Sequence, residues 1–463
     1  MLLLEAILVT LSVLVGSSTN NSSKSFNFNN IDINTIMKMK SVMEKMNSSN
    51  NPRNNLLHSL KPYLRESKQD KLDQYANLMN IAKIAEIFKK QGFKVTYNNK
   101  DSNLIEGITT ALINDSNLFG KIKTDILIME VDERYAKYIF KDIKPQTLVI
   151  TNICRDQPPR QGNYDKVALE ITKAISDDMT LVMNGDDPIL RRFKAKNIIY
   201  YGIDKNKYSY VRNKFHNLNI NYCPVCNSKL DYNYYIFENC GDYYCNKCDF
   251  KRPERKYIVN KINYDKGEIT INNKYTLSIP YNILFGIYNT LAAFTVSEIY
   301  NLNTNKTIEI ISNITKNTKI YNTYNYKDRL VTVLNNKNEN NTTFNQSLLY
   351  IDRFKDLKTI VIGWKEISRR YKYNDISWLY DVDFEILNKH NIDKIICVGN
   401  NCYDIATRIE LAGIDKKKIL PYNNLEEASN YLKKKTKGNI YGILNFDYVK
   451  PFNELMSEVS NDN

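Results

Sequence analysis

Three short runs decide the fold of this chain: ILIME at residues 126–130, TLVIT at 147–151 and TLVMN at 180–184. Each run is apolar and has about the length of a buried strand. Helix-like patterns lie near Asn103–Ile113 and Val167–Ser176. Strands that alternate with helices at this spacing predict a parallel, doubly wound α/β sheet.

The chain on the N-terminal side of these runs has a different character. A helical pattern covers Leu72–Gln91, and Phe93–Tyr97 has the pattern of a strand. Residues 17–60 are rich in Asn and Ser, which is typical of loops. Met1–Gly16 is apolar but shorter than the ~20 residues of a membrane-spanning helix, and it lacks the basic start of a secretory signal. We therefore predict, for residues 1–60, a short apolar helix that packs in the fold or grazes a membrane, followed by a low-complexity segment. A signal peptide is the alternative.

A second α/β region follows toward the C-terminus. Strand patterns at Leu357–Ile362 and Lys394–Val398 are followed by another helical pattern. We expect a central domain over residues 61–312, which carries a Cys-rich insert at 221–252, and a smaller α/β C-terminal domain over 313–463.

Four of the eight cysteines have the spacing of a structural zinc ribbon. Cys223-Pro-Val-Cys226 and Cys245-Asn-Lys-Cys248 are separated by the 18 residues 227–244. Each Cys-x-x-Cys knuckle brings two thiolates to one face of a tetrahedral zinc ion, and two knuckles leave no open position. A closed site is structural, so we assign it no catalysis. Two disulfides are the alternative, which we disfavour because a cytosolic α/β enzyme keeps its thiols reduced.

The composition is that of a globular protein with more than one domain. The chain has 463 residues, of which 43% are hydrophobic and 25% charged. Its net charge of +14 is compatible with an anionic substrate, an anionic membrane face or nucleic acid. Lys and Asn are abundant throughout while Gly is scarce, so we interpret the charge as a general bias rather than as a dedicated basic patch.

A series of motifs, in order along the chain, resembles the MurT family of Mur-ligase-type proteins. The motifs are Asn103–Ala111, Glu130-Val-Asp-Glu133, Asn152-Ile-Cys-Arg-Asp-Gln157 with Arg160, Gly162 and Asp165, Asn184-Gly-Asp-Asp-Pro188, Lys251-Arg-Pro-Glu254, Tyr288–Ala293, Asp375–Glu385, and the stretch from Gly399 to Gly413. The ribbon also falls where this family inserts one. A match that runs from about residue 100 to 415 is more specific than any single motif.

The resemblance implies a subunit of a lipid II isoglutaminyl synthase that works with a GatD-type glutaminase. ATP would phosphorylate the α-carboxylate of D-glutamate in lipid II, and ammonia from the partner would displace the phosphate, a step of peptidoglycan biosynthesis. Asn289 would contact the adenine, Asn152 and Arg155 would also bind the nucleotide, and Glu130 would hold magnesium.

The resemblance also implies a role for the C-terminal domain in the partner's reaction. Asp381 would orient the catalytic His of GatD and complete a Cys-His-Asp triad across the interface. Asp375 and Asp383 are neighbouring candidates for this role, and a carboxylate that only caps a helix start is the structural alternative.

The phosphate-binding loop departs from the family pattern Gly-x-x-Gly-Lys-Thr-Thr. No Gly occurs between Gly16 and Gly92, and the segment Asp73–Met79, where the loop should fall, supplies neither glycine geometry nor a Lys. Gly286 stands where the family has an adenine-side Asn. We therefore expect weak binding of ATP by this chain.

Two other classes of function remain open from the sequence. The chain can be a non-catalytic scaffold that only binds GatD, or a nucleic-acid-binding protein with a zinc ribbon. The ribbon's Tyr232, Tyr234, Tyr235, Tyr243 and Tyr244 would support the second if they were exposed, although ribbons also need such residues for their small core. We expect no nucleic-acid partner, and a cytoplasmic protein whose peripheral contact with the inner face of the membrane stays open.

Overall fold

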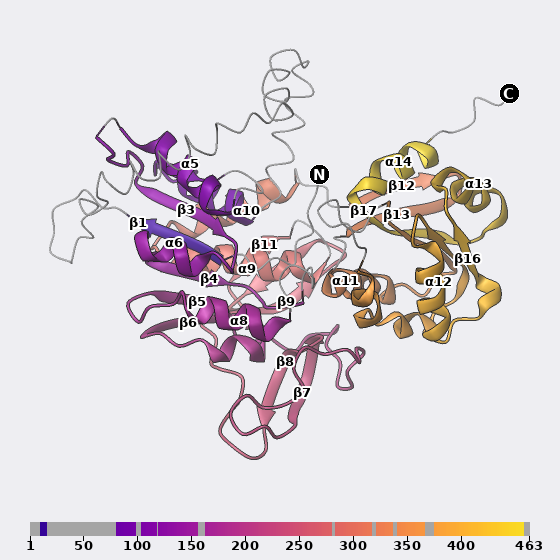
Figure 1. The fold of residues 1–463 in the computed structure, drawn as a ribbon, viewed down its shortest axis with the longest axis horizontal. Helices are drawn as coiled ribbons and strands as arrows, with labels where there is room; N and C mark the ends of the chain where they lie inside the picture. The colour runs from indigo at the N-terminus through magenta and orange to yellow at the C-terminus, as the bar shows by residue number, and fades with distance from the viewer. Residues whose placement is uncertain are drawn as a thin grey trace, which may run out of the picture.

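The computed structural model describes residues 10–15, 80–98, 103–117, 119–155, 163–279, 283–316, 321–336, 340–365 and 375–457. Two sheets and one hairpin organise these residues. The first sheet, drawn in indigo to salmon in Figure 1, belongs to the central domain, and the second, in salmon to yellow, belongs to the C-terminal domain. None of the described helices is both long and apolar enough to cross a bilayer.

The sheet of the central domain has the order β11-β10-β9-β6-β5-β4-β1-β3-β2. Its strands are β1 (Thr10–Val15), β2 (Val95–Tyr97), β3 (Ile126–Val131), β4 (Thr147–Ile150), β5 (Thr180–Asn184), β6 (Asn197–Ile203), β9 (Tyr257–Asn263), β10 (Glu268–Ile271) and β11 (Tyr275–Ser278). Strands β2 and β3 pair in parallel, as do β4, β5, β6 and β9, whereas β10 and β11 add an antiparallel edge. The predicted α/β class is confirmed, and the predicted runs at 126–130, 147–151 and 180–184 are β3, β4 and β5.

Helices cover both faces of this sheet. They are α4 (Asn80–Lys90), α5 (Ile105–Asp115), α6 (Ala136–Asp142), α8 (Tyr164–Thr172), the 3-10 helix η3 (Pro188–Arg192), α9 (Leu284–Ile299) and α10 (Thr304–Lys316). Strand β3 shows why the layers form, because all six of its residues are buried and successive side chains point to opposite faces. Ile126 and Ile128 join the apolar cluster of α4 and α9, whereas Leu127 and Met129 join that of α6 and α8.

The N-terminal segment corrects one prediction. A helix was expected over Met1–Gly16, but Thr10–Val15 form strand β1, and the rest of this segment lies outside the described residues. Strand β1 lies between β3 and β4 and is antiparallel to both. Three of its six residues are β-branched, which favours a strand. A position between two strands also gives the backbone of β1 hydrogen-bond partners on both edges. Tertiary pairing therefore overrides the helical tendency of this apolar segment.

The zinc-ribbon insert forms an antiparallel hairpin that projects from the central domain (Figure 1). Its strands are β7 (Leu230–Phe237) and β8 (Cys240–Cys245). The hairpin turn at Glu238 has a positive φ of 43° and directs this residue toward the C-terminal domain.

The C-terminal domain is built on a six-stranded sheet with the order β12-β13-β17-β14-β15-β16. Its elements are β12 (Tyr321–Tyr326), β13 (Arg329–Asn336), α11 (Asn341–Asp352), β14 (Lys358–Gly363), η4 (Ser377–Asp381), η5 (Phe384–Lys389), β15 (Ile392–Val398), α12 (Cys402–Leu411), η6 (Lys416–Lys418), β16 (Ile419–Tyr422), α13 (Leu425–Lys435), β17 (Asn439–Asn445) and α14 (Phe446–Ser457). The predicted strands at 357–362 and 394–398 are β14 and β15.

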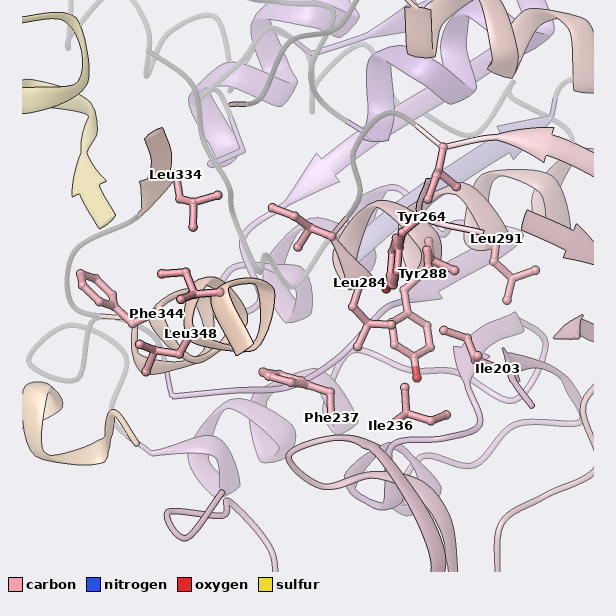
Figure 2. Close-up of a cluster of buried hydrophobic side chains, with 14 of the residues drawn as sticks. Ile203, Ile236, Phe237, Tyr264, Leu284, Tyr288, Leu291, Leu334, Phe344 and Leu348 are labelled. Atoms are coloured by element: carbon pink, nitrogen blue, oxygen red, sulfur yellow. The ribbon is translucent and has the colours of Figure 1, made fainter. Parts of the chain in front are cut away.

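One apolar cluster joins the two domains. Figure 2 shows it running from Leu284 and Tyr288 on α9, past Phe237 at the ribbon hairpin, to Phe344 and Leu348 on α11. Because α11 lies at the seam with its apolar side chains buried, the residues at its N-terminal end are placed beside the ends of the central strands.

Candidate functional site

Asn152 and Asn289, both predicted to bind nucleotide, line the same pocket. Asn152 follows the end of β4, and Asn289 lies on α9. The ribbon turn and Thr342 of α11 complete the lining, so the pocket lies at the seam between the domains. Its volume is about 40 Å³. Ligand pockets usually enclose about 300 Å³ or more, so this arrangement leaves no room for a nucleotide base unless the walls move apart.

The Asn-Gly-Asp-Asp motif anchors this pocket through two buried aspartates. Asp187 is the N-cap of η3, where it accepts from the Ile189 amide (2.9 Å), and it also accepts from the Ile153 amide (3.4 Å). Burial raises the pKa of Asp187 to about 7, while these backbone donors oppose the shift. This carboxylate therefore fixes the loop that carries Asn152.

Asp186 ties the same motif to the segment after the ribbon. Its carboxylate accepts from the Ile203 amide (2.6 Å) and the Tyr288 hydroxyl (3.0 Å). Arg252 and Arg255 lie 3.4 and 3.5 Å from the other oxygen. Two motifs that are separate in the sequence are thus one ion-pair network, and its role is to hold the end of β5, α9 and the post-ribbon segment together.

Glu238, at the ribbon turn, was not among the predicted site residues. It is buried and lines the pocket of Asn152 and Asn289. Asn345 donates to its Oε1 (2.8 Å) and Thr342 to its Oε2 (3.3 Å), both from α11. Burial raises the pKa of Glu238 to about 8. The signal that would have found it was a single carboxylate directly after the largely apolar run Tyr234–Phe237.

The three candidate aspartates of the C-terminal domain have different surroundings. Asp383 is fully buried and accepts from the backbone amides of His216 (3.0 Å) and Asn217 (3.3 Å). Asp375 accepts from the Ser377 amide (2.8 Å) at the start of η4. Asp381, the last residue of η4, keeps 29% of its side chain exposed.

Arg155 and Asp381 form an ion pair between the two domains. Both line a second pocket of about 400 Å³, which shares Asn219 with the pocket of Asn152. Arg155 was expected to bind nucleotide, and in this structure its described partner is Asp381. Burial raises the pKa of Asp381, and the Arg155 guanidinium opposes that shift.

Glu130, the expected magnesium ligand, lies apart from these pockets. It is buried near the end of β3, with its backbone amide and carbonyl both bonded to the side chain of Asn98 (2.9 and 2.8 Å). Asn103 donates to its Oε1 (3.2 Å). Carboxylate oxygens at a strand end are the donors that magnesium takes, so Glu130 fits such a role, although it lines neither pocket described above.

The four ribbon cysteines come together as a candidate metal site. All four sulfurs lie within 4.8 Å of one another, with Cys223–Cys248 at 3.5 Å and Cys226–Cys245 at 3.4 Å. Amides two residues on in each knuckle donate to the sulfurs of Cys223 and Cys245 (3.4 Å each). Four thiolates at this spacing fit a tetrahedral zinc ion with ~2.3 Å bonds. The eight cysteines are free thiols, so the structure does not support the disulfide alternative.

The five tyrosines considered for base stacking are buried or partly buried, whereas Tyr222 at the start of the insert is exposed. Tyr234 and Tyr243 are buried, and none of the five exceeds intermediate exposure. Tyr232 stacks on Tyr235 with ring centroids 4.2 Å apart. Stacking of nucleic-acid bases needs open aromatic faces, so this arrangement gives the nucleic-acid hypothesis no support.

Comparison with protein families matches residues 337–448 to the MurT ligase C-terminal family. The chain is 29% identical over 384 residues to the MurT subunit of lipid II isoglutaminyl synthase from Staphylococcus aureus strain COL, a match that covers 81% of this chain and 83% of the relative. It is 27% identical over 383 residues to the corresponding subunit from Streptococcus pneumoniae strain ATCC BAA-255 / R6, covering 80% and 83%.

Solved structures show the same fold. A pseudomurein peptide ligase type C from Methanothermus fervidus superposes with a TM-score of 0.60 at 21% identity, covering 82% of this chain and 76% of that one. MurF from Acinetobacter baumannii superposes with a TM-score of 0.54 at 12% identity, covering 82% and 74%. The chain is therefore similar to the MurT subunits over most of its length, it has the Mur ligase fold, and its residues 337–448 match the MurT ligase C-terminal family.

Proposed function

We propose that this chain is the MurT-like subunit of a lipid II isoglutaminyl synthase, which amidates the α-carboxylate of D-glutamate in lipid II with ATP and with ammonia from a GatD-type glutaminase. The observation that carries the proposal is that similarity to MurT subunits extends over 81% of the chain and so includes both domains. A relative that shared only the Mur ligase core would lack the C-terminal match at 337–448.

The ligase half-reaction would take place at the ends of the central strands. Asn289 and Asn152 would bind the nucleotide between the domains once the seam opens, since they already line one pocket. Glu130 would hold magnesium, which when bound neutralises charge on the transferring phosphoryl group. Phosphorylation turns the carboxylate of D-glutamate into an acyl phosphate, and ammonia then displaces the phosphate to leave the amide.

Asp381 would serve the partner's glutaminase site. Its two neighbours are committed inside the chain, Asp383 to backbone amides in the core and Asp375 to the start of η4. Of the three candidates, Asp381 lines the pocket of Arg155, and 29% of its side chain is exposed. A carboxylate in that position can accept the Nδ1 proton of an incoming imidazole and hold the tautomer that catalysis needs.

The proposal is tested by co-purifying the chain with its cognate glutaminase and assaying lipid II amidation. Asp381→Asn should lower the glutaminase activity of the complex and leave association intact, because Asn keeps the shape but loses the charge. Asp375→Asn is the matched control, since Asn can still accept from the Ser377 amide. If the two proteins do not co-elute at micromolar concentration, the proposal fails.

A non-catalytic scaffold that only binds GatD is the second candidate, and the phosphate-loop segment favours it. The segment Asp73–Met79, where the loop should fall, contains neither Gly nor Lys, so it lacks the residues that hold the β- and γ-phosphates. The scaffold hypothesis predicts a complex with glutaminase activity and no amidated lipid II.

A further inference from the structure

The ion pair between Arg155 and Asp381 joins segments that are 226 positions apart. Arg155 lies in the loop after β4 of the central domain, and Asp381 ends η4 of the C-terminal domain. Nη1 of Arg155 donates to Oδ2 of Asp381, while Nη2 lies 3.5 Å from the Ser377 hydroxyl. The guanidinium therefore contacts both ends of the same 3-10 helix.

The ion pair with Arg155 is the contact that orients the Asp381 carboxylate in this pocket. Among the described residues that line the pocket, Arg155 is the cation and Asp381 the anion, and the rest are neutral: Asn163, Tyr164, Asn217, Leu218, Asn219 and Asn341. In the part of the chain that the structure describes, no donor is bonded to Oδ1 of Asp381. Arg155 thus holds Oδ2, and Oδ1 has no donor among the described residues.

A triad carboxylate must be ionised and correctly oriented to work. It holds the imidazole in one tautomer and stabilises the imidazolium that forms, without itself taking the proton. Burial opposes the ionised form of Asp381, and docking of a partner over the pocket would increase that burial. An adjacent guanidinium counters this effect and, as a charge-assisted donor, also fixes the direction of the carboxylate.

We infer that Arg155, a residue of the ligase domain, is a positioning residue for the glutaminase reaction, because it holds Oδ2 of Asp381 and leaves Oδ1 to accept from the partner's imidazole. This inference rests on the proposed function, which supplies the partner and the role of Asp381. Arg155 lies three positions after Asn152, so the loop that borders the nucleotide pocket also carries the residue that orients the glutaminase carboxylate. The two half-reactions would thus share one loop of this chain.

The test measures glutamine hydrolysis by the complex of full-length chain and cognate glutaminase, as a function of pH. Arg155→Ala should lower kcat about ten- to a hundredfold, the usual effect of losing a charge-assisted contact, while KM for glutamine stays within about twofold. The acid limb of the kcat profile should move to higher pH, because Asp381 loses the charge that favours its ionised form. The titratable groups that line the pocket with Asp381 are Arg155 and Tyr164, and Asp383 is bonded to the amides of His216 and Asn217 instead.

Two variants make the result specific. Arg155→Lys keeps the charge and should restore the acid limb with only part of kcat, and it serves as the informative variant if Arg155→Ala does not fold. Arg212→Ala removes an exposed arginine that does not line the pocket and should leave kcat and the pH profile unchanged. Co-elution of each variant with the glutaminase shows that the complex forms.

The outcomes separate the inference from the proposed function. If Asp381→Asn lowers kcat while Arg155→Ala keeps both kcat and the pH profile of the wild type, the inference is wrong and the proposed function stands. If Asp381→Asn itself leaves glutamine hydrolysis unchanged, the proposed role of Asp381 fails and the inference falls with it. A loss of kcat in Arg155→Ala with a shifted acid limb that Arg155→Lys restores supports the inference.

Discussion

Three buried carboxylates near the domain seam differ in which neighbouring groups compensate for the loss of solvation of their charge. Asp186 is fully buried and has two arginines within 3.5 Å, so its charge is compensated. Asp187 relies on two backbone amides, and Glu238 on neutral side-chain donors of α11. Neutral donors compensate a buried charge less well than a guanidinium does. Glu238 is therefore the carboxylate whose protonation state should govern how tightly the ribbon turn holds the C-terminal domain.

Glu238→Gln should stabilise the protein at alkaline pH. The folded-state pKa of about 8 lies above the ordinary 4.5, so the folded chain holds this proton more tightly than the unfolded chain, and stability falls as pH rises from about 4.5 to about 8. Gln lacks this proton and can still accept from Asn345. Each unit of pKa shift corresponds to about 1.4 kcal/mol, so we expect the free energy of unfolding of the variant to exceed that of the wild type by at least about 1 kcal/mol at pH 9.

Urea denaturation at pH 5 and pH 9 measures this difference. The advantage of Glu238→Gln should be smaller at pH 5, where the wild-type carboxyl already holds its proton in the folded state. Glu254→Gln, at an exposed position near the ribbon, is the matched control and should show no such pH dependence. A difference that does not grow with pH would mean that Glu238 is not buried as a neutral acid.

At the scale of elements, the ribbon hairpin links the cysteine cluster at one of its ends to the domain seam at the other. One end of β7–β8 carries the four cysteines, and the other carries Glu238 against α11. A hairpin of two strands is marginally stable in isolation, so the metal site is expected to supply much of its folding free energy. The ribbon thus connects the candidate metal site to the domain seam.

Removal of zinc should unfold the ribbon before the two sheets. We predict one zinc ion per chain, bound by Cys223, Cys226, Cys245 and Cys248, and chelation should increase hydrogen exchange mainly in residues 221–252. Elemental analysis of protein purified without added metal, together with exchange before and after chelation, measures both effects. Cys240→Ser should keep the zinc, because Cys240 is not part of the sulfur cluster. A content well below one zinc per chain would contradict the assignment.

At the scale of the whole molecule, the contacts between the domains determine the size of the pocket that we propose for the nucleotide. The apolar cluster of Figure 2 continues from α9 to α11, and Lys214 and His390 meet at Asp352 with distances of 2.6 and 3.0 Å. These contacts hold the domains close enough that the pocket of Asn152 and Asn289 has about 40 Å³. If a nucleotide binds here as proposed, its binding must supply the free energy that separates these surfaces.

The chain alone should bind ATP in the millimolar range or more weakly. The expected phosphate-loop segment Asp73–Met79, which lies outside the described residues, has no glycine and no Lys. Loss of the Lys contact alone costs roughly 1.5 to 3 kcal/mol, which is about ten- to a hundredfold in affinity. Calorimetry with ATP and magnesium measures the dissociation constant. A micromolar value would overturn this prediction, and Lys121→Ala and Arg155→Ala would then show whether these residues supply the missing donors.

Local patterns in the sequence predicted a large part of the fold and the cluster of four cysteines. The apolar runs that became β3, β4 and β5 were predicted because each is buried on both faces, which makes the whole run apolar. The cysteine ligands were predicted because a Cys-x-x-Cys knuckle is a local structure whose spacing sets its geometry. The helix expected at Met1–Gly16 was wrong for Thr10–Val15, since a short apolar run is compatible with either helix or strand until its neighbours are known.

The sequence by itself thus determined the α/β class, the four cysteines that cluster and the resemblance to MurT, because each is recorded in the order and spacing of neighbouring residues. The tertiary structure alone decided that β1 runs antiparallel between β3 and β4, that Glu238 reaches α11, and that Arg155 pairs with Asp381. Those contacts join segments far apart in the chain. Which distant segments meet depends on how the apolar faces of two domains pack, and periodicity along the sequence carries no record of that.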